Sequence, residues 1–271
     1  MPELPEVETI ARGLDKRVRG DDIESVWLGS KPEPLKSSAE EIVATLESKT
    51  IAGVRRVGKH IVFDLTSSNG SAASNTQWIV HLGMTGSLRI SAPDVPVEKH
   101  THAILKLSSG RELRFIDPRR FGRLSVIERF DAPGSEPLHI SFEDFAKLFL
   151  KRKTPIKSAL LNQKLLSGVG NIYADEALFR ANISPRRRAS SLTRDELKRL
   201  HATLKKVLND AIRLGGSSIS DYVDADGEEG FFQLKHRVYG REGKPCLVCK
   251  TPIKRIVIAG RSSHYCPRCQ K

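Results

Sequence analysis

The sequence predicts an α+β protein in which a β-sandwich is followed by helices and then by a metal-stabilised hairpin. Three observations lead to this prediction. Short β-forming runs separated by turn residues fill the first half of the chain. After about residue 140 the apolar residues take on helical spacing instead. All four cysteines lie in the last 26 residues, in two Cys-x2-Cys pairs.

The β-forming runs recur at regular intervals through the first 130 residues. Many short strands with turn signals between them are typical of a β-sandwich or a barrel. Apolar residues from Val7 to Val18 have helical spacing, so we expect an N-terminal helix laid against this layer. A second helix is expected at residues 39–48. The expected strands are residues 23–28, 51–57, 61–66, 78–82, 88–91, 103–107, 112–116 and 124–127.

Proline and glycine interrupt the strand pattern at residues 131–140, which we interpret as a linker. Helices are expected beyond it, at 142–151, 155–161, 172–181 and 194–214. Ser141 and Thr193 have the spacing of helix caps, and Gly215 and Gly216 end the last helix. These boundaries divide the chain into residues 1–130, the linker 131–140, residues 141–232 and a terminal segment 233–271.

The charge balance indicates a polyanionic partner. Lys and Arg outnumber Asp and Glu by 45 to 32, which gives a net charge of +13. Such an excess favours nucleic acid over a membrane surface, although charge alone is a weak signal. No apolar run approaches the ~18 residues of a membrane span. Acidic residues stand where a signal peptide carries positive charge, so the sequence predicts a cytoplasmic protein.

Pro2 is the unusual residue at the N-terminus. If Met1 is removed, Pro2 carries a free secondary amine, and an α-amine titrates near pH ~8. A helix N-terminus lowers that value further, which leaves a nucleophile able to form an iminium with a carbonyl-like carbon. Glu3 beside it is a candidate proton donor or acceptor. The alternative is that both residues merely lead into an amphipathic helix.

The cysteine spacing is the most specific signal. Cys246 and Cys249 form one pair, and sixteen residues separate them from Cys266 and Cys269, as in a zinc ribbon. Four thiolates make a closed, structural zinc site. Two disulfides would need an oxidising compartment, which nothing else in the sequence indicates. The residues between the pairs are expected to form a β-hairpin with Arg261 at its tip.

Several segments resemble bacterial formamidopyrimidine-DNA glycosylases, which share a family with endonuclease VIII. The matching segments are PELPEVET from Pro2, VGKH around Lys59, MTGSL from Met84, DPRRFG at 117–122, LSGVGNIYADEAL at 166–178 and the zinc hairpin. They occur in the family's order along the whole chain. The resemblance implies a monomeric bacterial base-excision-repair enzyme, associated with the nucleoid. Its activity would be that of a glycosylase and AP lyase that removes 8-oxoguanine and formamidopyrimidines from duplex DNA.

The resemblance also implies residue roles. Pro2 would be the nucleophile, assisted by Glu3 and Lys59, and Arg261 would act as a second elimination acid or a phosphate clamp. Residues 166–178 would belong to a helix–two-turns–helix element, and residues 215–233 would close over the flipped base. Three residues would enter the base stack: Met84, Arg119 and Phe121. Further DNA contacts would be His100, Arg152, Lys157 and Asn171.

Two alternatives remain at this stage. An endonuclease VIII-like enzyme would have the same fold and nucleophile but would act on oxidised pyrimidines. A non-catalytic zinc-ribbon protein that binds bent or damaged DNA would fit the composition and the cysteines equally well. A panel of lesions tests the first alternative, and the mass of the N-terminal peptide tests the second.

Overall fold

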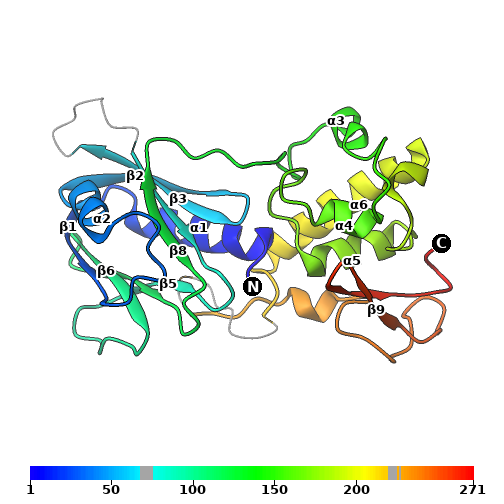
Figure 1. The fold of residues 1–271 in the computed structure, drawn as a ribbon. Coiled ribbons are helices and arrows are strands. Elements are labelled where there is room, and N and C mark those ends of the chain that lie inside the picture. The colour runs from blue at the N-terminus through cyan, green and yellow to red at the C-terminus, as the bar shows by residue number, and fades with distance from the viewer. Residues whose placement is uncertain (68–75, 219–224, 226) are drawn as a thin grey trace. The chain divides into compact units, whose positions relative to one another are not determined.

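The computed structural model describes residues 1–67, 76–218, 225 and 227–271, which form two compact units. The first unit comprises Met1–Asp131 with Gly215–Gly230, and the second comprises Ala132–Leu214 with Phe231–Lys271 (Figure 1). Among the described residues, no helix is both long enough and apolar enough to cross a membrane.

Two antiparallel four-stranded sheets form a sandwich in the first unit, which confirms the predicted fold class. One sheet has the order β1-β6-β7-β5 and the other β2-β3-β4-β8. The strands are β1 (Ile23–Leu28), β2 (Lys49–Val57), β3 (His60–Ser67), β4 (Gln77–His81), β5 (Ser87–Ser91), β6 (Thr101–Leu107), β7 (Glu112–Ile116) and β8 (Arg123–Ile127).

Side chains from both sheets and from helix α1 (Leu4–Val18) share one core. Phe63, Trp78 and Phe115 are each no more than 1% exposed. Helix α1 adds Ile10 and Leu14 to this core, because its apolar residues recur every three to four positions on one face. The short helix α2 (Ala39–Leu46) begins at Ser38, whose hydroxyl accepts the Glu41 N–H.

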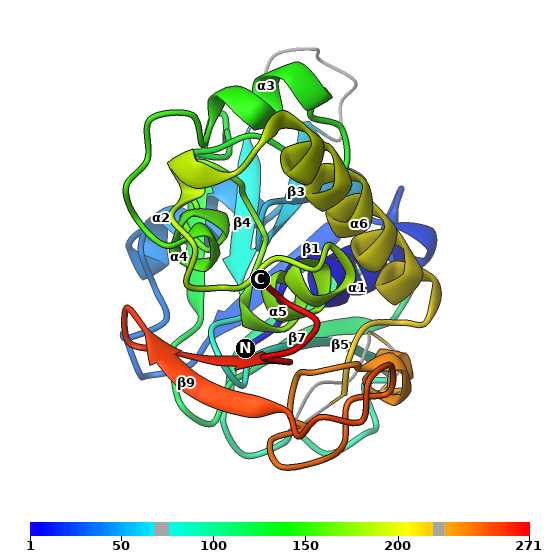
Figure 2. The ribbon, with the colours of Figure 1, turned by 90° about the vertical axis from the view of Figure 1, so that its right-hand side faces the viewer.

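Helices make up most of the second unit. α5 (Asn171–Arg180) packs along α6 (Arg194–Arg213), as Figure 2 shows. α3 (Phe142–Lys147) ends four residues before its predicted end, because Phe149 N and Arg152 N bond to carbonyls three residues back and close tight turns. The other elements are α4 (Ile156–Leu160) and the 3-10 turns η1 (Ala189–Ser191) and η2 (Phe232–Lys235).

The terminal segment contains the predicted hairpin, formed by β9 (Lys254–Ile258) and β10 (Arg261–Tyr265). Ala259 and Gly260 connect the strands with φ values of 48° and 76°. Positive φ at both central residues is the geometry of the tight turn that matches strand twist. Arg261 is therefore the exposed first residue of β10, next to the tip rather than at its centre.

Candidate functional site

The residues before α1 are held in a fixed arrangement. Pro2 and Glu3 are buried, and Glu3 is 4% exposed. Glu3 N donates to Glu6 Oε2 at 2.8 Å, in a reciprocal capping box that begins α1. This box places Pro2 at the positive end of the helix dipole, where an amine loses its proton more readily.

Glu6 also holds the start of the segment that follows α6. Its second oxygen, Oε1, accepts the Ser217 N–H at 2.8 Å, and Glu6 itself is 2% exposed. Gly216 has a φ of +84°, and a Cβ there would lie 2.9 Å from Glu6 Cγ. Much of the expected base-capping loop, residues 219–224 and 226, lies outside the described residues.

Lys59 lies in the two-residue turn between β2 and β3. This turn is tied to α1 through Arg56, whose Nε is 2.7 Å from Glu8 Oε2 and whose Nη1 donates to the Gly58 carbonyl at 3.1 Å. The Arg56 side chain is 5% exposed. A partly buried ion pair with these added bonds sets the turn relative to the helix that follows Pro2 and Glu3.

The three residues expected to enter the base stack lie on two adjoining turns. Met84 and Phe121 are 42% and 53% exposed, and Arg119 Cζ lies 4.9 Å from the centre of the Phe121 ring. Buried Asp117 joins the turns, because its Oδ1 accepts from Thr85 Oγ1 at 2.6 Å and its Oδ2 from Gly122 N at 2.7 Å. Two large apolar side chains are therefore presented together on one rigid support.

A Gly83→Ala substitution is expected to separate these turns. Gly83 has a φ of +62°, and a Cβ would lie 2.5 Å from Phe121 C. Backbone atoms cannot yield as a flexible side chain can, so we expect a loss of about 2–4 kcal/mol in stability and weaker DNA binding. Unfolding curves and binding to a lesion-containing duplex measure both effects.

Gly110→Ala is the matched control, because Gly110 also has a positive φ (+76°) but nothing lies within 4 Å of its added Cβ. It should lose about 1 kcal/mol from backbone strain alone and keep its DNA affinity. Equal effects of the two substitutions would show that the contact between the turns is unimportant.

His81, the last residue of β4, contacts the turn that carries Met84. Its Nδ1 accepts the Gly83 N–H at 3.0 Å. Burial, together with nearby His60, Arg123 and Lys59, lowers the pKa of His81 to about 4. The imidazole is therefore neutral at physiological pH, as its acceptor role requires.

Stability should consequently fall in mild acid. The unfolded imidazole binds its proton near pH 6.5 and the folded one near pH 4. The unfolded state holds more protons between these values, so the contribution is complete above pH 6.5 and is lost toward pH 4. The full contribution of His81 to the free energy of unfolding is about 3 kcal/mol.

His81→Asn keeps an acceptor without titrating, so the melting temperature of this variant should fall less than that of the wild type between pH 6.5 and 4.5. Parallel curves would contradict this assignment.

His100, an expected DNA contact, is exposed on the segment before β6, with a φ of 71°. Together with Trp27, Lys31 and Arg120 it lines a pocket of about 450 Å³. Trp27 is 50% exposed. An accessible indole beside cations is suited to a nucleic-acid strand.

In the second unit, the predicted residues Asn171 and Arg261 lie where α5 meets the hairpin, and Arg152 lies after α3. Asn171 begins α5, and its Nδ2 donates to Ser262 Oγ at 3.2 Å, next to Arg261. Gly170 caps the helix, so the first amide groups of α5 face the same region and favour an anion. Arg152 is exposed, and its Nε donates to the Leu148 carbonyl at 2.8 Å.

Lys157, which the resemblance implies as a phosphate contact, has its side chain in an internal ion pair. The side chain is completely buried, and its Nζ lies 2.7 Å from Asp175 Oδ1 and donates to the Ser262 carbonyl at 2.5 Å. Asp175 is equally buried, and its Oδ2 accepts the His264 N–H at 2.9 Å. The ammonium thus holds β10 against α5 and α4 instead of reaching outward.

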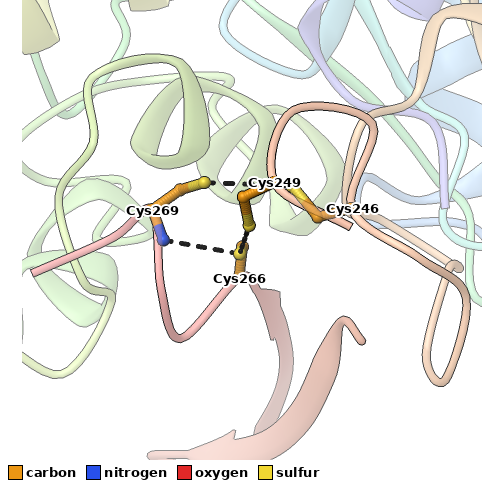
Figure 3. A group of neighbouring side chains, drawn as sticks. All are labelled: Cys246, Cys249, Cys266 and Cys269. Atoms are coloured by element: carbon orange, nitrogen blue, oxygen red, sulfur yellow. Dashed lines mark hydrogen bonds between the residues drawn. The ribbon is translucent and has the colours of Figure 1, made fainter. Parts of the chain in front are cut away.

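The four cysteines converge at the base of the hairpin (Figure 3). All four Sγ atoms lie within 4.8 Å of one another, with Cys246–Cys269 at 3.9 Å and Cys249–Cys266 at 3.4 Å. Tetrahedral zinc with bonds of about 2.3 Å needs sulfurs roughly 3.8 Å apart. The residues therefore fit one structural zinc ion, held by Cys246, Cys249, Cys266 and Cys269.

Sequence reasoning did not predict the hydrogen bonds of several buried acidic residues. Besides Glu6, Asp117 and Asp175, they include Glu176, which is fully buried and accepts the N–H groups of Arg237, Val238 and Tyr239 at 2.9–3.0 Å. Burial raises the pKa of Glu176, while these backbone bonds and Arg180 oppose the rise. The available signal was the pair Asp175-Glu176, which lies between apolar residues in the middle of α5.

Comparison with known proteins covers the whole chain. Residues 1–124 match the formamidopyrimidine-DNA glycosylase N-terminal domain and residues 133–223 match its H2TH domain. Residues 243–271 match a zinc finger found in FPG and IleRS. Formamidopyrimidine-DNA glycosylase of Solibacter usitatus is 46% identical, and that of Listeria monocytogenes is 41% identical, each over all of both chains.

Solved structures agree with this relationship. A Lactococcus lactis FPG mutant in complex with Fapy-dG containing DNA has a TM-score of 0.90 at 35% identity, covering all of both chains. MutM (FPG) of Thermus thermophilus has a TM-score of 0.87 at 43% identity, covering 99% of this chain and 98% of that one. The chain therefore belongs to the formamidopyrimidine-DNA glycosylase family of DNA-repair enzymes.

Proposed function

We propose that the protein removes oxidised purines, 8-oxoguanine and formamidopyrimidines, from duplex DNA and then cleaves the strand, with Pro2 as the nucleophile. The observation that carries the proposal is the arrangement at the start of α1. Buried Pro2 and Glu3 precede a helix N-terminus, and Glu6 bonds both Glu3 N and Ser217 N at 2.8 Å. Relatives solved with Fapy-dG containing DNA and with abasic-site DNA support the substrate class.

The chemistry starts from the Pro2 amine, which requires removal of Met1. The nitrogen forms a bond to deoxyribose C1′ as the glycosidic bond breaks, and the departing base accepts a proton. Glu3 carries a proton to the sugar as the ring opens. The product is an iminium between Pro2 and C1′, which acidifies the C2′–H bond.

Strand cleavage follows from that iminium. Loss of the C2′ proton expels the 3′ phosphate by β-elimination, and a δ-elimination then expels the 5′ phosphate. We assign Lys59 to the sugar and its phosphate, and Arg261 to the second elimination or to clamping a phosphate. Met84, Arg119 and Phe121 would fill the space left by the extruded base, with Arg119 at the opposite base. His100, Arg152 and Asn171 would bind the backbone, and the enzyme would act as a monomer in the bacterial cytoplasm at the nucleoid.

Borohydride trapping tests this proposal. Protein of verified N-terminal mass is reacted with duplex DNA containing 8-oxoguanine opposite cytosine, in the presence of borohydride. We expect a covalent adduct that maps to Pro2 in the wild type and is reduced by at least about tenfold in Pro2→Gly. A parallel duplex with an oxidised pyrimidine tests the endonuclease VIII-like specificity.

Pro5→Ala is the matched control, because Pro5 is also a buried proline at the start of α1 but carries no free amine. It should form the adduct as the wild type does. An undiminished adduct that maps to a residue other than the N-terminal one would exclude Pro2 as the nucleophile. No adduct on either lesion, with Met1 removed and DNA binding intact, would favour a non-catalytic DNA-binding protein.

A further inference from the structure

A second pocket lies in the second unit, between the end of α6, η2 and the first cysteine knuckle. Its volume is about 660 Å³. Pockets of this size accommodate several amino-acid side chains or a drug-sized molecule. None of the residues given a role in the proposed chemistry lines it.

The charge of the pocket is strongly positive. Three cations share Asp210: Lys206 Nζ lies 3.3 Å away, Arg180 Nη1 3.6 Å away, and Arg213 bonds it directly. Although burial opposes it, bonds from Arg213 and Lys206 hold the pKa of Asp210 below its usual value, so it stays ionised. The charged lining residues are Arg180, Lys206, Arg213, Lys235, Arg237 and the single acid Asp210.

The adjacent histidine adds no charge. Burial lowers the pKa of His236 to about 4, so its ring is neutral at physiological pH. Glu176 on α5 is a further charged group near the wall, fully buried and 4.0 Å from Arg180. The pocket thus retains a clear excess of positive charge at its mouth.

Part of the lining is apolar. Phe232 is fully buried and packs 5.5 Å from the Tyr173 ring, so it forms a fixed wall. Leu234 is 76% exposed and Leu247 46% exposed at the rim. Val248 beside Leu247 is 67% exposed. Apolar side chains exposed together around a pocket are typical of binding surfaces.

The pocket is separate from the site at the hairpin. Arg180 is the last residue of α5 and Asn171 the first, so about 14 Å of helix separates them. A DNA phosphate bound at Asn171 would therefore not itself reach the residues of this pocket. A phosphate backbone would also gain little from Phe232, Leu234 and Leu247, because its contacts are electrostatic.

We propose that this pocket binds a short acidic peptide segment that carries an apolar side chain and belongs to a partner protein. Its carboxylates would meet the cations of α6 and η2, and its apolar side chain would pack between the exposed side chains of Leu234 and Leu247. Clusters of Arg and Lys recognise acidic motifs in this way, and charge complementarity favours rapid, specific association. Such a contact would bring the enzyme to a site of DNA metabolism without occupying its DNA-binding residues.

A defined peptide tests the proposal directly. The probe is a labelled ten-residue peptide with four aspartates and two phenylalanines, and binding to the full-length, zinc-loaded protein is followed by fluorescence anisotropy. We expect saturable binding that is at least tenfold weaker in Lys235→Glu/Arg237→Glu, whose side chains are exposed. Leu234→Ser should weaken it about threefold to tenfold, as should replacing both phenylalanines of the peptide by serine.

Lys198→Glu/Arg199→Glu is the control, because it reverses two exposed charges elsewhere on α6. It should bind the peptide as the wild type does, and circular dichroism and glycosylase activity should be unchanged in all these variants. The proposal would be overturned if the wild type showed no saturable peptide binding, or if the control variant lost as much peptide affinity as Lys235→Glu/Arg237→Glu. It would also be overturned if the serine-containing peptide bound as tightly as the original one. Loss of duplex DNA affinity specific to the Lys235→Glu/Arg237→Glu variant would show a nucleic-acid site instead, and would overturn it too.

Discussion

Removal of the zinc ion is expected to unfold the terminal segment, residues 233–271. The small core there combines Phe179, Val238 and Ile253 with the buried thiols of Cys246 and Cys266. So few apolar side chains cannot order two knuckles and a hairpin unaided. Structural zinc contributes on the order of 10 kcal/mol to comparable zinc fingers. Chelation or Cys266→Ser should therefore expose the hairpin to protease and abolish tight DNA binding.

Cys249→His serves as the control, because imidazole nitrogen is also a good zinc ligand and Cys249 is partly exposed at the site. This variant should retain one zinc per chain and resist the protease. If zinc-free protein kept the protease pattern and DNA affinity of the holoprotein, the metal would not be a structural component.

Substitution of Lys157 by Met should be the most damaging single change outside the zinc site. It leaves Asp175 charged and completely buried without its ammonium partner. Breaking a buried pair in this way costs about 3–5 kcal/mol. It also removes the bond from Nζ to the Ser262 carbonyl, next to Arg261. We expect faster amide exchange at His264, whose N–H bonds to Asp175, and slower strand cleavage.

Two further variants separate the effect of the unpaired buried charge from the effect on the position of the hairpin. Lys157→Met/Asp175→Asn removes both charges but keeps an acceptor for His264, so more than half of the lost stability should return while cleavage stays slow. Lys153→Met, at an exposed lysine in the same segment, should change neither quantity. Full recovery of cleavage in the double variant would show that the Nζ–Ser262 bond does not position the hairpin.

The strands and the long helices could be predicted because burial of one face makes apolar residues recur at the period of a strand or a helix. β1 and β7 lie at the expected residues, and α6 begins after its Thr193 cap as expected. The exposure of Met84 and Phe121 could likewise be predicted, because both lie among turn residues, and their role at DNA stays a prediction. Each of these signals comes from residues that lie close together in the sequence.

The buried polar contacts could not be predicted in this way. Lys157 lies 18 residues from Asp175 in the chain and 105 from Ser262, and a lysine in a helix is normally solvated. Glu6 and Ser217 are 211 residues apart. Residues this far apart in the sequence become partners only in the folded chain, so the periodicity of the sequence cannot predict their contacts.

The double use of the Glu6 carboxylate makes the first turn of α1 and the segment at Ser217 thermodynamically dependent on each other. One oxygen bonds Glu3 N and the other bonds Ser217 N. Whatever orders residues near Ser217 must also favour the helical start beside Pro2, and by linkage the reverse holds with the same free energy. Under the proposed function, a bound base that orders Ser217 would also stabilise the start of α1 beside Pro2, and removal of Met1 would change the free energy of the Glu6–Ser217 bond in return.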